Sequence, residues 1–290
     1  MEINKYHGCG NDFLIAMDPP LSQTQKKQLV IALCERHTGI GADGFIFVSM
    51  HPLEMKYYNR DGSRAWMCGN GIRCFAKYLW DTGRLRKQHY IVQSGPHHVE
   101  VNIQCQDPFT VAIDLGIPSI ASKWIQSSDQ KEIWGRKLTV NEQEFIVDTL
   151  YVQTIHTVVL VENAQANWEK IGEVLHCHPL FLAKTNVNFA EVIDRDHVRI
   201  VTYERGVGLT NACGTGCAAV AWDMWKHGIC DNDVTLLCAQ GTLQIHIDPA
   251  NGAVTLIGGA QKIMSGAISD TFIHSCLDEK AGEPLDHNAY

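Results

Sequence analysis

Two short stretches of the chain have the same form: Met67-Cys68-Gly69-Asn70-Gly71 and Ala212-Cys213-Gly214-Thr215-Gly216. In each, a cysteine precedes Gly-x-Gly, and a run of helical character follows. A cysteine at the start of a helix lies beside free backbone N–H groups and the positive end of the helix dipole, and both stabilise a thiolate. The glycines let the backbone approach a ligand, and the free N–H groups can bind a carboxylate. The pair therefore predicts two thiols that face one anionic substrate from opposite sides.

The order of the predicted elements indicates an α+β fold of two similar halves, each a mostly antiparallel sheet around a central helix. Strands, a glycine loop with a cysteine, a helix and further strands occur twice, which favours a repeat over a doubly wound sheet. The central helices are expected at 72–79 and 217–225. An earlier helix is expected at 21–36, with Ser22 as its N-terminal cap.

A polar run at 122–131 predicts the boundary between the halves. The N-terminal half is expected to span 1–118 and the C-terminal half 119–262. We expect residues 263–276 to return to the N-terminal half, and 277–290 to form a polar tail.

Composition excludes several classes of protein. A net charge of −8 supplies no basic surface for nucleic acid, and no apolar run approaches the roughly 20 residues of a membrane helix. The N-terminus has no signal-peptide core, so we expect a cytoplasmic protein with reduced cysteines. Among the 11 cysteines there is no Cys-x2-Cys pair, and no Gly-x-Gly-x-x-Gly opens a βαβ unit, so no metal or nucleotide cofactor is expected. Most other cysteines are expected to be small core residues: Cys34, Cys74, Cys105, Cys217 and Cys238.

Several blocks, in order and spread over nearly the whole chain, resemble the diaminopimelate epimerase family. They are His7–Phe13, Gly39–Asp43, Asn59–Ser63, Met67–Cys74, Asn186–Phe189, Tyr203–Gly206 and Ala212–Gly216. The resemblance implies two halves related by a pseudo-twofold axis, with an amino-acid substrate in the cleft between them. It also implies catalysis without pyridoxal phosphate or metal, and a homodimer.

The implied reaction removes the α-proton of an amino acid and returns a proton to the opposite face. Two groups on opposite faces invert the centre directly, and one must be a thiolate while the other is a thiol. We assign these roles to Cys68 and Cys213. Backbone donors for the substrate carboxylate are expected at Gly69, Asn70, Gly214 and Thr215.

Further roles follow from the resemblance alone. It implies that Asn11 binds the reacting end of the substrate, and that His156 and Glu204 flank the thiols and assist their protonation. The distal amino-acid group would be held by Asn59, Asn186, Glu204 and Arg205. Arg205 can bind a carboxylate bidentately, and Glu204 can accept from an ammonium.

The chain departs from the family pattern at four positions. Gly44 stands where a glutamine is usual, Thr154 replaces an asparagine, Leu209 replaces a glutamate and Cys9 replaces a leucine. Three functions therefore stay open: epimerisation of LL-diaminopimelate to the meso form, racemisation of another amino acid such as histidine, and ligand binding by an inactive relative.

Overall fold

The computed structural model describes residues 1–66, 69–121 and 123–277. Within these residues, 18 strands are hydrogen-bonded into one continuous mixed sheet, and five helices accompany it. No described helix is both long and apolar enough to cross a membrane.

The first half of the fold consists of β1 (Glu2–Gly8), β2 (Asn11–Met17), α1 (Gln23–Cys34), β3 (Gly44–Met50), β4 (Leu53–Asn59), β5 (Arg64–Ala65), α2 (Gly69–Asp81), β6 (His89–Ser94), β7 (His97–Gln106) and β8 (Phe109–Gly116). The second half consists of β9 (Arg136–Val140), β10 (Gln143–Val152), β11 (Thr154–Leu160), α3 (Glu169–His176), β12 (Asn186–Val192), β13 (His197–Glu204), β14 (Gly208–Thr210), α4 (Gly214–Lys226), β15 (Asp233–Cys238), β16 (Gly241–Ile247) and β17 (Val254–Gly259). The described chain ends with β18 (Gln261–Ala267) and α5 (Asp270–Leu277).

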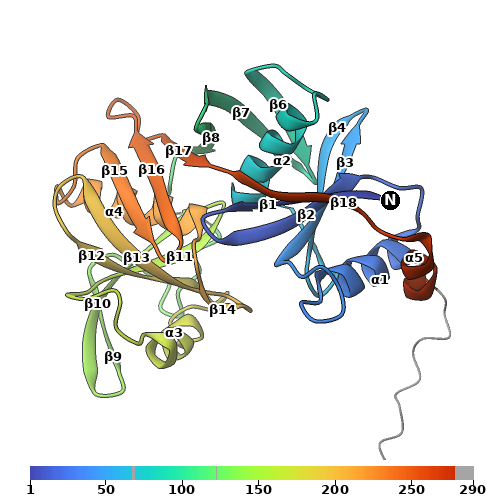
Figure 1. Cartoon of the computed structure of the whole chain (residues 1–290). Helices are drawn as coiled ribbons and strands as arrows, with labels where there is room; N and C mark the ends of the chain where they lie inside the picture. The colour runs from blue at the N-terminus through green and yellow to red at the C-terminus, as the bar shows by residue number, and fades with distance from the viewer. Residues whose placement is uncertain (67–68, 122, 278–290) are drawn as a thin grey trace, which may run out of the picture.

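The two halves repeat one pattern of strand pairing. In the first, β1 and β2 are antiparallel, β2 and β3 parallel, and β3 and β4 antiparallel. In the second, β10, β11, β12 and β13 follow one another with the same three directions. Figure 1 shows the two lobes that result, with α1, α2 and α5 in one and α3 and α4 in the other. The predicted α+β fold of two similar halves is confirmed.

Each half is built around one buried helix. The first helix, α2, packs against β1, β2, β8 and β18, and the second, α4, packs against β10, β11, β16 and β17. Small side chains allow the sheet to approach α4 closely, since Cys217, Ala218, Ala219 and Ala221 are fully buried. The halves are joined where β8 pairs with β17. This pairing fixes the position of α2 relative to α4.

The predicted N-cap of α1 is confirmed, while the helix itself spans Gln23–Cys34 and is shorter at both ends than the expected 21–36. Ser22 is its N-cap and accepts from the backbone N–H of Gln25, whose side chain accepts in return from the N–H of Ser22. This reciprocal pair is a capping box.

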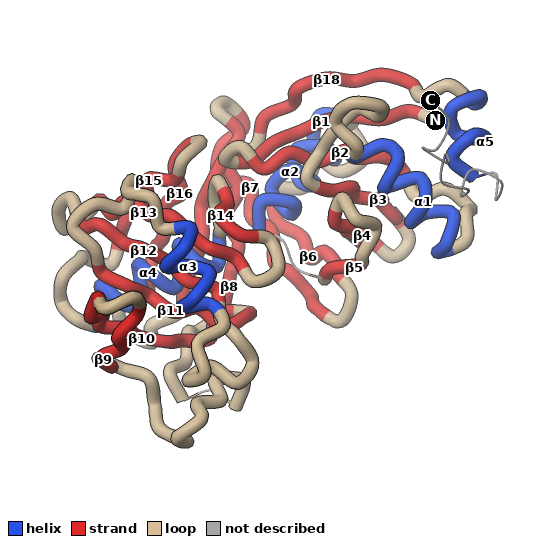
Figure 2. The backbone as a smooth tube through the Cα atoms, turned by 90° about the horizontal axis from the view of Figure 1, so that it is seen from below, coloured by secondary structure: helices blue, strands red, loops and turns tan. Residues whose placement is uncertain are grey.

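The C-terminal segment crosses the first half along its edge. The last strand, β18, pairs antiparallel with β1, with Glu2 opposite Ala267. The following helix, α5, packs on α1 through Phe272 and Ile273, and Figure 2 shows these neighbours side by side. The helix α5 was not expected from the sequence. It ends at Leu277, the first residue of the segment expected to be a polar tail, and residues 278–290 of that segment lie outside the described residues.

One expectation about the cysteines is wrong. Cys34, Cys74 and Cys217 are buried as expected, but Cys105 is exposed. The register of β7 against β8 shifts between Ile103 and Cys105, so the inward and outward alternation of β7 changes there. Cys238 is partly buried.

Candidate active site

The N-termini of α2 and α4 meet where the two halves adjoin. Cys213 is the N-cap of α4, and its carbonyl accepts from the N–H of Cys217 at 2.8 Å. A carbon placed at the Cβ position of Gly214 would lie 4.0 Å from the Cα of Gly69, the first residue of α2. Cys68 lies outside the described residues. The fold therefore brings the starts of the two predicted cysteine helices together, as the paired sequence stretches suggest.

Two further contacts connect these helix starts. The side-chain Nδ2 of Asn70 donates to the carbonyl of Ala212, next to Cys213, at 3.1 Å. The Oδ1 of Asn70 accepts from Arg73 at 2.7 Å, and Nε of Arg73 donates to the carbonyl of Gly259 on β17 at 3.1 Å. Arg73 is fully buried. Arg73 lies in the motif Met67–Cys74, where the sequence indicates no role for it; in the fold it fixes the start of α2 against the other half.

A chain of hydrogen bonds leads from His156 to the sulfur of Cys213. The Nε2 of His156 lies 3.0 Å from the hydroxyl of Thr215. That hydroxyl lies 3.5 Å from the sulfur of Cys213. His156 comes from β11 and the other two from the start of α4, so this arrangement belongs wholly to the second half.

Asn188 determines the donor and the acceptor in each of these hydrogen bonds. Its Nδ2 donates to the carbonyl of Thr157 at 3.1 Å and faces Nδ1 of His156 at 3.3 Å. Its Oδ1 accepts from the hydroxyl of Thr202 at 3.1 Å. Since Nδ1 of His156 then accepts, Nε2 carries the proton and donates to Thr215. The Thr215 hydroxyl is left to donate to Cys213, which favours the thiolate.

His156 is neutral in this environment. It is fully buried, and desolvation lowers its pKa to about 3, with the positive charge of Arg205 adding to the shift. A neutral imidazole is what the hydrogen-bond pattern requires, because a protonated ring could not accept from Asn188.

The buried state of His156 predicts a loss of stability in acid. Between pH 6.5 and about 3 the unfolded chain binds a proton at this residue and the folded chain does not, so the free energy of unfolding falls as the pH falls. Between pH 7 and pH 5 the contribution is about 2 kcal/mol. Urea unfolding at both pH values should show this difference reduced in His156→Gln. The same substitution at the exposed His37 should leave it unchanged; equal pH dependence of wild type and His156→Gln would contradict the assignment.

Glu204 is a second group that contacts Cys213. Its Oε1 accepts from the hydroxyl of Thr210 at 2.7 Å, and its carboxyl shares a hydrogen bond with Cys213. Burial raises the pKa of Glu204, and the bonds from Thr210 and Cys213 offset part of the increase. A carboxyl with a raised pKa exchanges a proton with a thiol more readily than an ordinary glutamate does.

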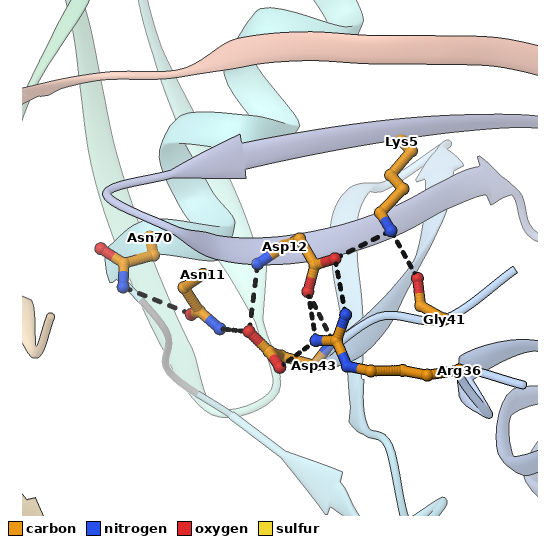
Figure 3. A network of polar contacts seen from close by, with 7 residues as sticks. All are labelled: Lys5, Asn11, Asp12, Arg36, Gly41, Asp43 and Asn70. Carbon is orange, nitrogen blue, oxygen red and sulfur yellow. Dashed lines mark hydrogen bonds and ion pairs between the residues drawn. The ribbon is translucent and has the colours of Figure 1, made fainter. Parts of the chain in front are cut away.

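Asn11 lies in a polar network of the first half (Figure 3). Its Nδ2 donates to Asp43 at 2.8 Å, and its Oδ1 accepts from Asn70 at 3.3 Å. Asp43 is held by Arg36, which also pairs with Asp12 at 3.0 Å. Asn11 is thus attached both to the start of α2 and to a cluster of charges, which fixes its amide next to the paired helix starts.

The charges in this network hold Asp12 ionised. Burial by itself would raise the pKa of Asp12, but hydrogen bonds from Lys5 and Arg36 outweigh it and lower the pKa. The Lys5 ammonium lies 2.9 Å from Asp12 and also donates to the carbonyl of Gly41 at 2.7 Å. The β1–β2 hairpin is therefore held firmly to the loop that precedes β3.

Two of the predicted distal residues are joined to each other. Oδ1 of Asn186 accepts from the backbone N–H of Arg205 at 2.8 Å, and its Nδ2 donates to the carbonyl of Ile155 at 3.1 Å. The guanidinium of Arg205 is exposed and donates to the carbonyl of Ala183 at 2.9 Å. Thr154 begins β11 opposite Val152. Asn186 shapes the turn that presents Arg205.

Asn59 lies on the first half, where it contacts neither Asn186 nor Arg205. It accepts from the hydroxyl of Tyr57 at 2.8 Å and donates to Ser63 at 2.9 Å. Tyr57 also occupies the space beside Gly44: a Cβ at position 44 would lie 2.5 Å from Cε2 of Tyr57. Gly44, which departs from the family pattern, therefore leaves the space that Tyr57 needs in order to hold Asn59.

Adding a side chain at position 44 is expected to destabilise the protein. Gly44→Ala should lower the free energy of unfolding by about 1–3 kcal/mol, because the new methyl group overlaps Tyr57 and the carbonyl of Tyr58. Urea unfolding measures the change. Gly259→Ala is the matched control, since its Cβ would have a nearest neighbour at 3.4 Å, and equal losses in both variants would contradict the steric explanation.

Four residues that contact the candidate site could not be assigned from the sequence alone: Arg73, Asn188, Thr202 and Thr210. A partial signal existed for Asn188, because Asn186 and Asn188 lie two residues apart on a strand and share a face. Thr202 and Thr210 have no such signal, since their partners are set by the pairing of β12 with β13 and of β13 with β14.

Solved structures define the class of fold. A Bacillus anthracis phenazine biosynthesis protein of the PhzF family superposes with a TM-score of 0.68 at 14% identity, covering 93% of this chain and 99% of that one. A hydroxyproline epimerase from Agrobacterium vitis gives a TM-score of 0.65 at 13% identity, covering 92% and 90%. At such low identity these likenesses show a shared fold.

Sequence comparison identifies the family. The family model described as diaminopimelate epimerase matches residues 3–120 and 149–263. Proteins named diaminopimelate epimerase are 34% identical in Alkaliphilus metalliredigens, covering 94% of this chain and 99% of the relative, and 34% identical in Clostridium perfringens, covering 92% and 98%. The chain belongs to the diaminopimelate epimerase family, and it is an isomerase.

Proposed function

We propose that this protein epimerises LL-diaminopimelate to meso-diaminopimelate, with Cys68 and Cys213 as the two proton-transferring groups. The observation that carries the proposal is the approach of Gly69 and Gly214, because it brings together the starts of two helices that each follow a cysteine. The names of the 34% identical relatives supply the substrate.

The reaction divides into removal and return of one proton. In one direction a thiolate takes the α-proton of the substrate, and the opposite thiol gives its proton to the other face of the same carbon. The former thiolate ends as a thiol and the former thiol as a thiolate, so the roles are exchanged after each turnover. Backbone N–H groups at Gly69, Asn70, Gly214 and Thr215 bind the substrate carboxylate, where negative charge builds up as the proton leaves.

His156 and Glu204 set the state of Cys213. The donor chain from His156 through Thr215 favours the thiolate. The carboxyl of Glu204 shares a hydrogen bond with Cys213 and can exchange a proton with it when the direction of reaction reverses. Together they let one sulfur serve as base in one direction and as acid in the other.

The distal end of the substrate would be held by Asn59, Asn186, Glu204 and Arg205. Arg205 offers an exposed guanidinium for a carboxylate, and Glu204 a carboxyl for an ammonium. Gly44 and Thr154 favour a second candidate, racemisation of another amino acid such as histidine, because Tyr57 fills the space where a longer side chain at position 44 would contact substrate. An inactive binding protein remains as the third outcome of the test.

The biological setting is proposed with the activity. Meso-diaminopimelate is a precursor of lysine and of peptidoglycan, so the enzyme would work in the cytoplasm, without cofactor, as a homodimer that binds neither nucleic acid nor membrane.

Incubation in deuterated water with a panel of amino acids tests the function. The protein, kept reduced because two facing thiols can oxidise, is supplied with LL-diaminopimelate and with L-amino acids that include histidine. Deuterium incorporation at the α-carbon of diaminopimelate alone is the expected result. Incorporation into a different amino acid alone would establish the racemase alternative, and none into any substrate would indicate an inactive relative.

A further inference from the structure

A cavity of ≈ 760 Å³ opens in the second half, lined by residues of β10, β11 and the C-terminal end of α4. None of the residues proposed for the reaction lines it. Three of the lining side chains bring possible metal ligands together at one point: Asp148 on β10, Asp223 on α4, and His227, the C-cap of α4. Their ligand atoms all lie within 4.8 Å of one another.

The measured separations suit a single bound ion. Nε2 of His227 is hydrogen-bonded to Oδ2 of Asp148 at 3.0 Å and lies 3.7 Å from Oδ1 of Asp223, so a bound ion would replace the hydrogen bond. Ligands that each lie about 2.0–2.2 Å from one ion can be at most about 4.3 Å apart, so both separations are within range.

The buried carboxyl of Asp223 interacts with Asp148, but its Oδ1 has no hydrogen-bond partner among the described residues. The side chain of Asp223 is 1% exposed and faces the cavity. Buried polar atoms are nearly always paired, and an unpaired one indicates a role or an absent ion.

The other two residues are held in place by further contacts. The backbone N–H of Gly135 donates to Oδ1 of Asp148, and Trp134 stacks on the ring of His227 with 4.8 Å between ring centroids. Contacts of this kind orient the ligands of a metal ion and are needed for tight binding.

The surroundings carry negative charge. Glu144 and Glu162 also line the cavity, and the described lining residues include no lysine or arginine. Lys137 pairs with Glu144 from outside, at 2.7 Å. The site lies at the C-terminal end of α4, where the helix dipole is negative and favours a cation.

We propose that Asp148, Asp223 and His227 bind one divalent cation of the Mn²⁺ or Zn²⁺ type. An imidazole together with two carboxylates suits these ions, whereas Mg²⁺ and Ca²⁺ prefer oxygen ligands alone. The ion would hold the C-terminal end of α4 to β10. Because Cys213 lies at the opposite end of the same helix, the ion stabilises the element that positions the thiol and takes no part in proton transfer.

Titration of the chelator-treated, reduced full-length protein with MnCl₂ tests this site. Mn²⁺ is the probe because thiols, of which this chain has many, bind Zn²⁺ far better than Mn²⁺. Electron paramagnetic resonance of free Mn²⁺ should show one ion bound per chain. Asp223→Asn and His227→Gln should each weaken binding at least about tenfold, and the melting temperature should rise with Mn²⁺ in the wild type only.

Asp233→Asn and His246→Gln are the matched controls. Asp233 and His246 form an exposed Asp–His pair, 2.7 Å apart, outside the cavity, and their variants should bind Mn²⁺ like the wild type. Circular dichroism checks that each variant is folded. If His227→Gln does not fold, the near-isosteric Asp223→Asn alone tests the site. No binding by the wild type up to about 1 mM, unchanged binding by Asp223→Asn, or equal loss in the controls would overturn the proposal, whatever the substrate proves to be.

Discussion

Replacing Cys213 by serine is expected to lower the rate of epimerisation by about 10³-fold. The hydroxyl of serine is far less acidic than a thiol, so it supplies neither a base for one direction nor an equally good acid for the other. The fold should survive the change, because serine differs from cysteine by one atom and the side chain of Cys213 makes no hydrogen bond that caps α4. The conversion of LL- to meso-diaminopimelate measures the effect.

Two comparisons make this result specific. Cys68→Ser should produce a loss of similar size, since each turnover uses both sulfurs. Cys177→Ser is the control, because Cys177 is an exposed free cysteine whose sulfur donates to backbone carbonyls of its own helix. A Cys213→Ser enzyme with more than about a tenth of the wild-type rate would contradict the role of this thiol.

Replacing Glu204 by glutamine is expected to lower kcat by about 10²-fold. Glutamine keeps the shape and can still accept from Thr210, but it cannot take up or release a proton. The proton that Glu204 exchanges with Cys213 would then have no nearby carrier. Glutamine does not titrate, so any dependence of kcat on the ionisation of Glu204 should be lost. The acidic limb of the plot of kcat against pH should therefore also change.

Glu100→Gln is the control for this substitution. Glu100 is an exposed glutamate on β7 that pairs with His89, so its replacement should leave kcat and the pH profile unchanged. If Glu204→Gln raised only KM and left kcat alone, Glu204 would serve substrate binding and not proton transfer.

The local features of the site could be predicted from the sequence. Cys213 precedes Gly-x-Gly and an apolar run, and this pattern marks the start of α4. Ser22 and Gln25 likewise mark the start of α1. These signals lie within a few residues of one another, so no knowledge of the fold is required. The repeat could also be predicted, because the order of strands, glycine loop, helix and strands occurs twice along the chain.

The long-range contacts could not be predicted in the same way. Arg73 reaches Gly259, 186 residues away, only because β8 pairs with β17. The proposed cation site combines a local and a long-range contact. Asp223 and His227 lie four residues apart at the end of α4, which the sequence shows directly. Asp148 is brought beside them only by the packing of β10 on α4. The short helix α5 carries only a weak pattern of its own and is stabilised by packing on α1.

The position of solvent deuterium during the first few per cent of reaction tests the two-thiol mechanism most directly. LL-diaminopimelate is converted in deuterated water, and the product and the remaining substrate are analysed separately for deuterium at the α-carbon. With one group on each face, the product receives its proton from the solvent-exchanged thiol, so deuterium should be found in the meso product while the recovered LL substrate stays unlabelled. Equal early labelling of substrate and product would mean that a single group serves both faces, and would contradict the account.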